Sequence, residues 1–178
     1  GTVPQTGTAV LDTSKGIDME GSGSIGGTAD SFRYASLPTF GNFDMTVRID
    51  SIESGSASAK AGIMVRQGDA SNAKYYAVFA KQTGGFGYSY RSVAGGTAVE
   101  SFSGTTSFPK WLKVERKDNV FYAYTAPDIS GSPGDWVQIS GSTQSIQMDW
   151  EVMAGLAAAS SDSSLKKGAD LLRKQLGY

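Results

Sequence analysis

Two arginines have the residue type and position needed to bind a ligand. In GIMVRQ and FGYSYR, Arg66 and Arg91 alternate with the apolar residues of predicted strands, so they lie on the opposite face. Three further residues are predicted to share that face: Met64, Tyr76 and Ser89. If these strands are neighbours in one sheet, we expect one polar and aromatic patch. Such a patch suits a glycan, because aromatic rings stack on sugar C–H groups and arginines bond hydroxyls. Alternatively, the arginines pair with acids such as Asp69, and the tyrosines only cover the sheet.

A pair of carboxylates offers a different chemistry. Asp149 and Glu151 in MDWEV are two residues apart, so in a strand they would project from the same face as an acid and a nucleophile. A third acid, which glycan-cleaving strands of this kind carry, is missing nearby, and Trp150 has the opposite parity. We therefore expect a solvated face and predict that the protein is not an enzyme, with glycan cleavage at Asp149 and Glu151 as the alternative.

A calcium ion is compatible with the sequence, because calcium requires only oxygen ligands. Asp30 in GTADSF and Asp18 in GIDMEG are the candidate acids, and neither lies in an acid-dense loop. Asp30 is equally suited to capping a turn. The prediction is therefore no cofactor, with a structural calcium ion at Asp30 as the alternative.

The composition excludes several classes of function. The chain of 178 residues contains no cysteine and no histidine, which removes disulfides, Cys/His zinc sites and Ser-His-Asp triads. Its 16 basic and 17 acidic residues give no overall field that would attract nucleic acid or an acidic membrane surface. The apolar stretches are too short to span a bilayer. We expect neither a nucleic-acid partner nor a membrane span.

The elements that would hold these residues are strands. Glycine pairs at 26–27, 84–85 and 95–96 punctuate the chain at the spacing of an antiparallel sandwich. In FGNFDMTVRIDSI, apolar residues alternate with polar ones, and the predicted core residues are Phe43, Met45, Val47 and Ile49. The stretch WLKVERKDNVFYAYTA predicts a hairpin that turns at Lys-Asp-Asn. Its predicted core residues are Leu112, Val114, Phe121 and Ala123.

Two tryptophans, Trp111 and Trp136, lie in or near the predicted strands. Trp111 shares its face with Lys113 and Glu115, opposite Leu112. It either packs beneath a loop, which we favour, or offers a platform for stacking on a ligand. Trp136 in GDWVQIS is expected to be a packing residue.

The end of the chain has a helical pattern. In SLKKGADLLRKQLGY, apolar residues recur every three to four positions, a serine could cap the start, and Gly177 follows the last leucine. The sequence thus predicts a β-sandwich domain over 1–162 and a C-terminal helical extension over 163–178. This amphipathic helix either packs on the sandwich or docks on another protein. The predicted partner-binding residues are Leu165, Leu172 and Leu176.

Six segments together resemble one family of extracellular modules. They are GGTADSFRYASLP (26–38), AKAGIMVRQ (59–67), GGFGYSYRSVAGG (84–96), WLKVERKDNVFYAYTAPD (111–128) with DWVQIS (135–140), and VMAGLAAASSD (152–162). In this order the chain resembles the concanavalin A-like (laminin-G-like) jelly rolls found beside bacterial glycoside hydrolases and in surface adhesins. The resemblance implies an all-β antiparallel jelly-roll β-sandwich, extracellular or at the cell surface. It also implies a non-catalytic carbohydrate-binding accessory module, secreted or adhesive, whose partner is a polysaccharide or other glycan.

The chain departs from that family at its C-terminus. Members usually add another strand after the segment that resembles GLAAASSD, where this sequence has the helical pattern. A competing function follows from the departure: a structural or protein-interaction module that contacts a partner in a surface or multi-enzyme assembly through the C-terminal helix.

Overall fold

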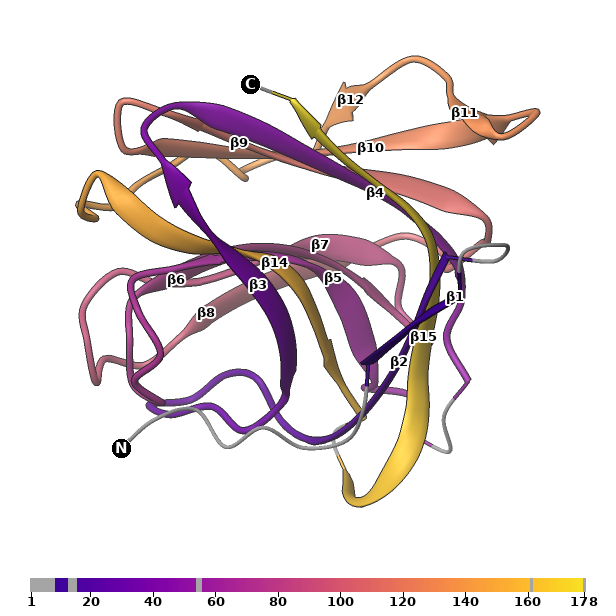
Figure 1. The fold of residues 1–178 in the computed structure, drawn as a ribbon, viewed down its shortest axis with the longest axis horizontal. Helices are drawn as coiled ribbons and strands as arrows, with labels where there is room; N and C mark the ends of the chain where they lie inside the picture. Colours follow the sequence, from indigo (N-terminus) through magenta and orange to yellow (C-terminus); the bar gives the residue numbers. More distant parts are fainter. Residues whose placement is uncertain (1–8, 13–15, 54–55, 161, 178) are drawn as a thin grey trace.

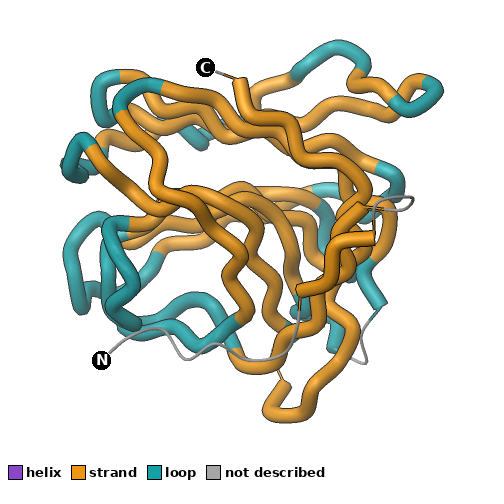
Figure 2. Tube along the Cα trace, viewed as in Figure 1, coloured by secondary structure: helices purple, strands orange, loops and turns teal. Residues whose placement is uncertain are grey.

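The chain forms two antiparallel sheets packed face to face. The computed structural model describes residues 9–12, 16–53, 56–160 and 162–177, and all regular elements in this part are strands (Figures 1 and 2). One sheet has nine strands: β1 (Ala9–Asp12), β2 (Gly16–Gly23), β15 (Asp162–Gly177), β4 (Phe43–Ser51), β9 (Lys110–Lys117), β10 (Val120–Ile129) and β11 (Ser132–Pro133), in that order, with β12 (Val137–Gln138) and β13 (Gln144–Ser145) also paired to β10. The other has six, in the order β3 (Arg33–Phe40), β14 (Glu151–Ala159), β5 (Lys60–Arg66), β6 (Tyr75–Lys81), β7 (Phe86–Arg91) and β8 (Val99–Ser103). The β-sandwich prediction is confirmed.

The main core lies between the two sheets, where the alternation of the sequence places it. The predicted core residues of β4 and of the hairpin are all buried, as are Ile63 and Val65 of β5. The hairpin turn has Asp118 at φ 50° and Asn119 at φ 61°, the two positive angles of the tight turn that suits twisted strands. These predictions from period-two alternation are confirmed.

The C-terminal helix prediction is wrong for residues 163–177. They belong to strand β15, which lies between β2 and β4 in the nine-stranded sheet (Figure 1). An isolated helix of this length is marginal in water, whereas two neighbouring strands supply backbone partners along both sides. Irregularities shift the register on both sides, and Leu165 and Leu172 fall within them. Such bulges accommodate a sequence without strict alternation.

A second apolar layer lies on the other face of the six-stranded sheet. Residues 24–32, which we call the cover segment, contribute Ile25 and Phe32 to a buried cluster with alternate residues of the sheet: Met64, Tyr75, Ala77, Phe79, Ala157 and Ala159. Both faces of this sheet are therefore buried at its centre. The sheet has no open central face on which a ligand could lie.

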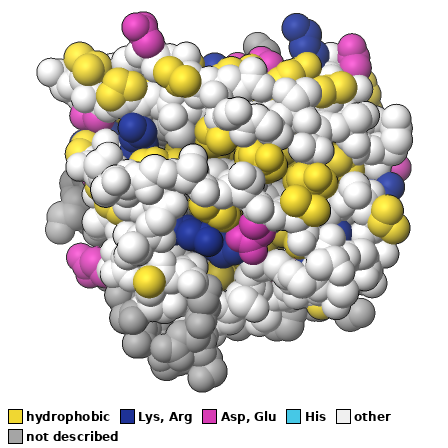
Figure 3. Space-filling model, turned by 180° about the vertical axis from the view of Figure 1, so that it is seen from behind, with side chains coloured by type: hydrophobic (Ala, Val, Ile, Leu, Met, Phe, Trp, Pro, Cys, Tyr) yellow, Lys and Arg dark blue, Asp and Glu magenta, His cyan; other side chains and the backbone are white. Residues whose placement is uncertain are grey.

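The described surface gives no sign of a strongly charged face in the view of Figure 3. Seen from behind, basic and acidic side chains are scattered among polar and apolar ones. This dispersal agrees with the near balance of charges in the sequence. Within the described ranges, no helix has the length and hydropathy to cross a bilayer.

Candidate functional site

The structure brings four of the five predicted ligand residues together, but beneath the surface. Arg66 of β5 and Arg91 of β7 both pair with Tyr75 of β6, which lies between them. Two residues further along β6, Ala77 pairs with Met64 and Ser89 in the same way. All four predicted side chains on this face are fully buried. Tyr76 belongs to the opposite face, where it stacks on Phe121 in the main core. The expectation of an exposed patch is therefore wrong, and the tyrosine of this face is Tyr75.

Asp30 of the cover segment accounts for both buried arginines. Its Oδ2 accepts hydrogen bonds from Arg66 Nη1 at 2.7 Å and from Arg91 Nη1 at 2.8 Å, and its Oδ1 accepts one from Arg91 Nη2 at 2.9 Å. The amide of Gly26 donates to the same Oδ1. Asp69, the acid suggested by the sequence, is exposed. The protein's own carboxylate thus takes the place that a ligand was expected to fill.

The same contacts bear on the calcium alternative. A cation at Asp30 would have to compete with two guanidinium groups that already bond both oxygens. Within the described ranges, no group of three or more acids, histidines or cysteines is placed to hold a metal ion. A structural calcium ion elsewhere stays a prediction without a position.

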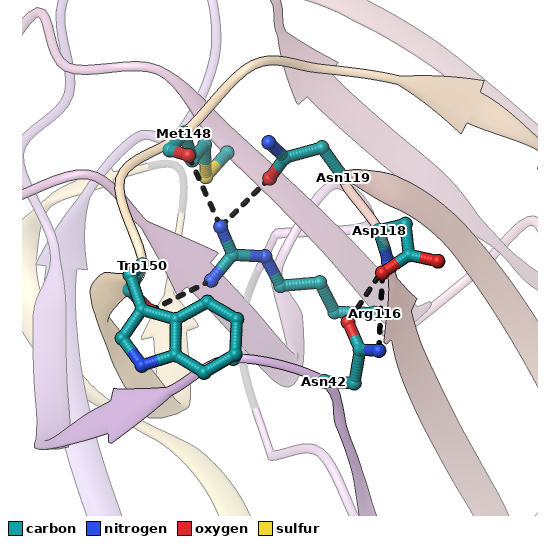
Figure 4. A pocket seen from close by; sticks show the side chains of 7 residues that line it. Asn42, Arg116, Asp118, Asn119, Met148 and Trp150 are labelled. Carbon is teal, nitrogen blue, oxygen red and sulfur yellow. Dashed lines mark hydrogen bonds between the residues drawn. The ribbon is translucent and has the colours of Figure 1, made fainter.

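A hollow of about 290 Å³ lies where three turns meet at one end of the sandwich (Figure 4). The β3–β4 turn supplies Gly41 and Asn42, and the end of β9 with its hairpin turn supplies Arg116, Asp118 and Asn119. The segment before β14 supplies Met148 and Trp150. The three segments lie far apart in the sequence, so only the fold brings these residues together.

Trp150 is the main apolar surface of this hollow. Its side chain is 72% exposed, the highest value among the large hydrophobic residues described. The six-membered part of its ring lies over Gly41, whose main-chain amide donates to the Trp150 carbonyl at 2.9 Å. A Cβ atom on Gly41 would be 2.6 Å from that ring. Glycine at this turn therefore allows the indole to occupy a fixed and solvent-facing position.

Arg116 holds the segment that carries Trp150. Its guanidinium donates to the carbonyls of Trp150 and Met148, each at 3.2 Å (Figure 4). The same group donates to the carbonyl of Asp149. It also donates to Asn119 Oδ1 at 2.7 Å. Burial lowers the pKa of Arg116, and the charge of Asp149 acts in the opposite direction. Because its donors are directed at main-chain carbonyls, Arg116 positions the site rather than offering a free cation.

The rim of the hollow is polar. Asn42 and Asp118 form a reciprocal pair across the two turns: Asn42 Nδ2 donates to Asp118 Oδ1 at 3.2 Å, and the Asp118 amide donates to Asn42 Oδ1 at 2.9 Å. Both side chains are exposed. An exposed indole beside amide and carboxylate groups is the combination that binds one face and the hydroxyls of a sugar ring.

A second hollow, of about 400 Å³, adjoins the chain neighbours of Trp150. It is lined by Asp149 and Glu151, together with Gln67, Gly68, Val152 and Met153. The two acids singled out in the sequence are both exposed here. They flank Trp150 in the chain, so the candidate catalytic pair and the exposed indole belong to one region of the surface.

The other tryptophans have structural surroundings. Trp111 is 1% exposed and its Nε1 donates to Asp128 Oδ1 at 2.9 Å, which confirms that it is a packing residue. Trp136 is half-buried, with the Lys113 ammonium 4.6 Å from its ring centre.

Sequence reasoning missed the principal site residues, namely Asn42, Arg116, Asp118, Asn119, Met148 and Trp150. One signal was present: Trp150 lies between two acids just before an apolar strand, on the parity opposite to them. Nothing in the sequence indicates that the turns at 41–42 and 118–119 would meet it.

The comparisons with known proteins give the fold. No protein-family model matches the chain, and no curated protein does. A solved structure of a functionally unknown protein from Saccharomyces cerevisiae is 15% identical with a TM-score of 0.69, over 99% of this chain and 94% of that one. A xylan β-1,4-xylosidase from Bacillus halodurans is 14% identical with a TM-score of 0.66; the match covers 90% of this chain and 33% of that one. A legume lectin-like domain from Entamoeba histolytica is 9% identical with a TM-score of 0.52; the match covers 96% of this chain and 87% of that one. The chain therefore shares a β-sandwich fold with these proteins and spans about a third of the xylosidase.

Proposed function

We propose that the protein is a non-catalytic carbohydrate-binding module of the concanavalin A-like jelly-roll type. The observation that carries the proposal is Trp150, an indole that is 72% exposed and held in a hollow with a polar rim. An exposed indole offers a flat apolar face, and that face suits the C–H side of a pyranose ring. The ligand site lies at this end of the sandwich, in place of the patch at Arg66 and Arg91.

The fold adds support of a general kind. Similar sandwiches occur within a xylan-degrading enzyme and as a lectin-like domain. An accessory role beside a polysaccharide-degrading enzyme, or adhesion at a cell surface, would place the protein outside the cell. These settings are part of the proposal.

Retention on polysaccharide gels tests the site. The wild-type protein is expected to be retarded in a native gel that contains a glycan from a panel of xylan, β-glucan and galactomannan. Trp150→Ala removes most of one stacking contact, so binding should fall about tenfold or more. Ile129→Ala is the matched control, because Ile129 is 60% exposed and lies at the far end of β10. Equal retention of wild type and Trp150→Ala would contradict the site.

Glycan cleavage is the alternative to pure binding. Asp149 and Glu151 line the second hollow, and hydrolysis would need both acids. We expect no release of reducing ends from any glycan that the protein retains. Release that disappears in the Asp149→Asn and Glu151→Gln variants would show instead that the region is catalytic.

Contact with a protein partner through a C-terminal helix was the competing function. The helix is replaced by β15, whose backbone pairs with β2 and β4. The side chains of Leu165, Leu172 and Leu176 lie outside the described residues, so their role in binding a partner stays a prediction.

A further inference from the structure

The charges around Trp150 carry an inference about the class of glycan, which rests on the proposed function. The residues that line the two hollows include three acids, Asp118, Asp149 and Glu151, and one base, Arg116. All three acids are exposed, whereas Arg116 is 4% exposed. The accessible charge at the site is therefore negative, although the whole chain is nearly neutral.

The basic residues near the site direct their donors at the protein itself or away from the hollows. Three of the four acceptors bonded by Arg116 are main-chain carbonyls, and the fourth is the side chain of Asn119. The half-buried Lys74 donates to the carbonyl of Gln147 at 2.8 Å. Lys117 follows Arg116 on β9 and so projects from the other face of the sheet. Arg116, the base among the lining residues, thus directs both Nη atoms at acceptors of the protein itself.

The second hollow is also rich in acceptors. Besides the exposed carboxylates of Asp149 and Glu151, it is lined by the side-chain amide residue Gln67. Exposed carboxylate oxygens favour groups that donate hydrogen bonds, such as the hydroxyls of a sugar. They disfavour a uronate or sulfate, which would bring further acceptors and a like charge.

We propose that the Trp150 region selects glycans without acidic groups and discriminates against anionic ones. The indole supplies the stacking contact, while Asp118, Asp149 and Glu151 accept hydrogen bonds from hydroxyls and repel carboxylates and sulfates. The selectivity is electrostatic, so it depends on ionic strength.

Matched pairs of polymers test this selectivity by affinity gel electrophoresis. The pairs are arabinoxylan with glucuronoxylan and hydroxyethylcellulose with carboxymethylcellulose. In low salt we expect the uncharged member of a bound pair to bind about tenfold more tightly, because several like charges lie within a screening length. At about 0.5 M salt, where the screening length is a few ångströms, the ratio should fall to less than about threefold.

Charge-removing variants give the second measurement. Asp118→Asn and Glu151→Gln should each lower the ratio of uncharged to anionic binding by about threefold in low salt. Asp69→Asn is the control, since Asp69 is exposed near the second hollow but does not line it. Its ratio should change less than that of either lining variant.

The outcomes separate the two proposals. Binding of the anionic member as tight as that of its uncharged partner would overturn the selectivity and leave the carbohydrate site standing. A ratio that is insensitive to salt and to both lining variants would do the same. If no polymer of any pair is retained, the proposed function itself is overturned.

Discussion

The carboxylate of Asp30 accepts a hydrogen bond from Arg66 at 2.7 Å, and both side chains have no exposure to solvent. Arg91 bonds the same carboxylate. Phe32 and Tyr75 lie beside the Arg66 guanidinium, with ring centres 5.6 and 5.7 Å away. This ion cluster links the cover segment to β5 and β7, the strands that carry the arginines.

Asp30→Asn should therefore destabilise the protein. The substitution leaves two buried guanidinium groups without their counter-charge, which typically costs about 3–5 kcal/mol of unfolding free energy. Urea unfolding followed by tryptophan fluorescence measures the loss. Asp69→Asn is the matched control, and as a change at an exposed acid it should stay within about 0.5 kcal/mol. Similar unfolding free energies for the two variants would show that the cluster contributes little to stability.

Three tyrosines predict a loss of stability in alkali: Tyr75 and Tyr76 are buried, and Tyr34 is half-buried. Burial raises the pKa of Tyr34, Tyr75 and Tyr76 well above the ordinary value of 10.0. Their hydroxyls bond within the protein, for example Tyr76 to the Ser142 carbonyl at 2.6 Å. The folded state then holds protons that the unfolded chain has lost, so stability present below pH 10 falls as the pH rises further. Each tyrosine contributes up to about 1.4 kcal/mol per pH unit.

The pKa shift of Lys60 has the opposite sign to those of the tyrosines, so it limits the pH range over which unfolding free energies report the tyrosines alone. Burial lowers its pKa from 10.5, so the unfolded chain holds the extra proton and the contribution of Lys60 to stability rises with pH up to 10.5. Unfolding free energies above that value report the tyrosines. Phenolate absorbance is the second readout: three of the eight tyrosines should ionise only when the protein unfolds. Titration of all eight in the folded protein would refute the assignment.

Gly41 is predicted to be required for the position of Trp150. Gly41→Ala adds a Cβ that would meet the indole at 2.6 Å, and it also introduces a side chain at φ 66°. We expect the affinity for a retained glycan to fall about fivefold or more because the stacking surface moves. The control is Gly104→Ala, at φ 85° with no atom within 4 Å of the new Cβ.

Both glycine variants should lose about 1 kcal/mol of unfolding free energy, because each places alanine in the left-handed region. Only Gly41→Ala should lose binding, as measured by affinity electrophoresis. Equal binding of the two variants would show that the indole does not depend on the turn.

Removal of β15 distinguishes a strand from an appended helix. A chain that ends at Ser160 lacks the partner of both β2 and β4, so it should lose cooperative thermal unfolding or aggregate through the two open edges. Loss of an appended helix would leave the sandwich folded. Amide hydrogen exchange on the intact protein is the complementary measurement, since residues paired on both sides, such as Leu171, should be protected.

The sequence predicted the strands and their core faces well, because alternation is a local property. Ile63 and Val65, for example, lie in the main core while Met64 lies on the other face. The stretch from Tyr75 to Ala80 is apolar at every position and is buried at every position. An unbroken apolar run indicates a strand covered on both faces. It contains no alternation that could have assigned Tyr75 and Tyr76 to the correct sides.

The candidate site and the C-terminus depend on contacts between distant residues. Arg116 reaches the carbonyls of Met148, Asp149 and Trp150, more than thirty positions away, and no local pattern encodes that contact. The leucine spacing at the C-terminus favoured a helix on local grounds. The segment forms a strand instead, because β2 and β4 each offer it a free edge for backbone pairing. Tertiary context of this kind often overrides a weak helix propensity.

The place of β15 also affects how the protein is made. Of the described strands it leaves the ribosome last, yet it fills a position inside the nine-stranded sheet between β2 and β4. Until residues 162–177 have emerged, the nascent chain must hold two unpaired strand edges that could join another chain. The sheet can close only after its final strand is synthesised. We therefore expect a folding step that waits for the synthesis of β15, and a dependence of yield on chaperones that shield such edges.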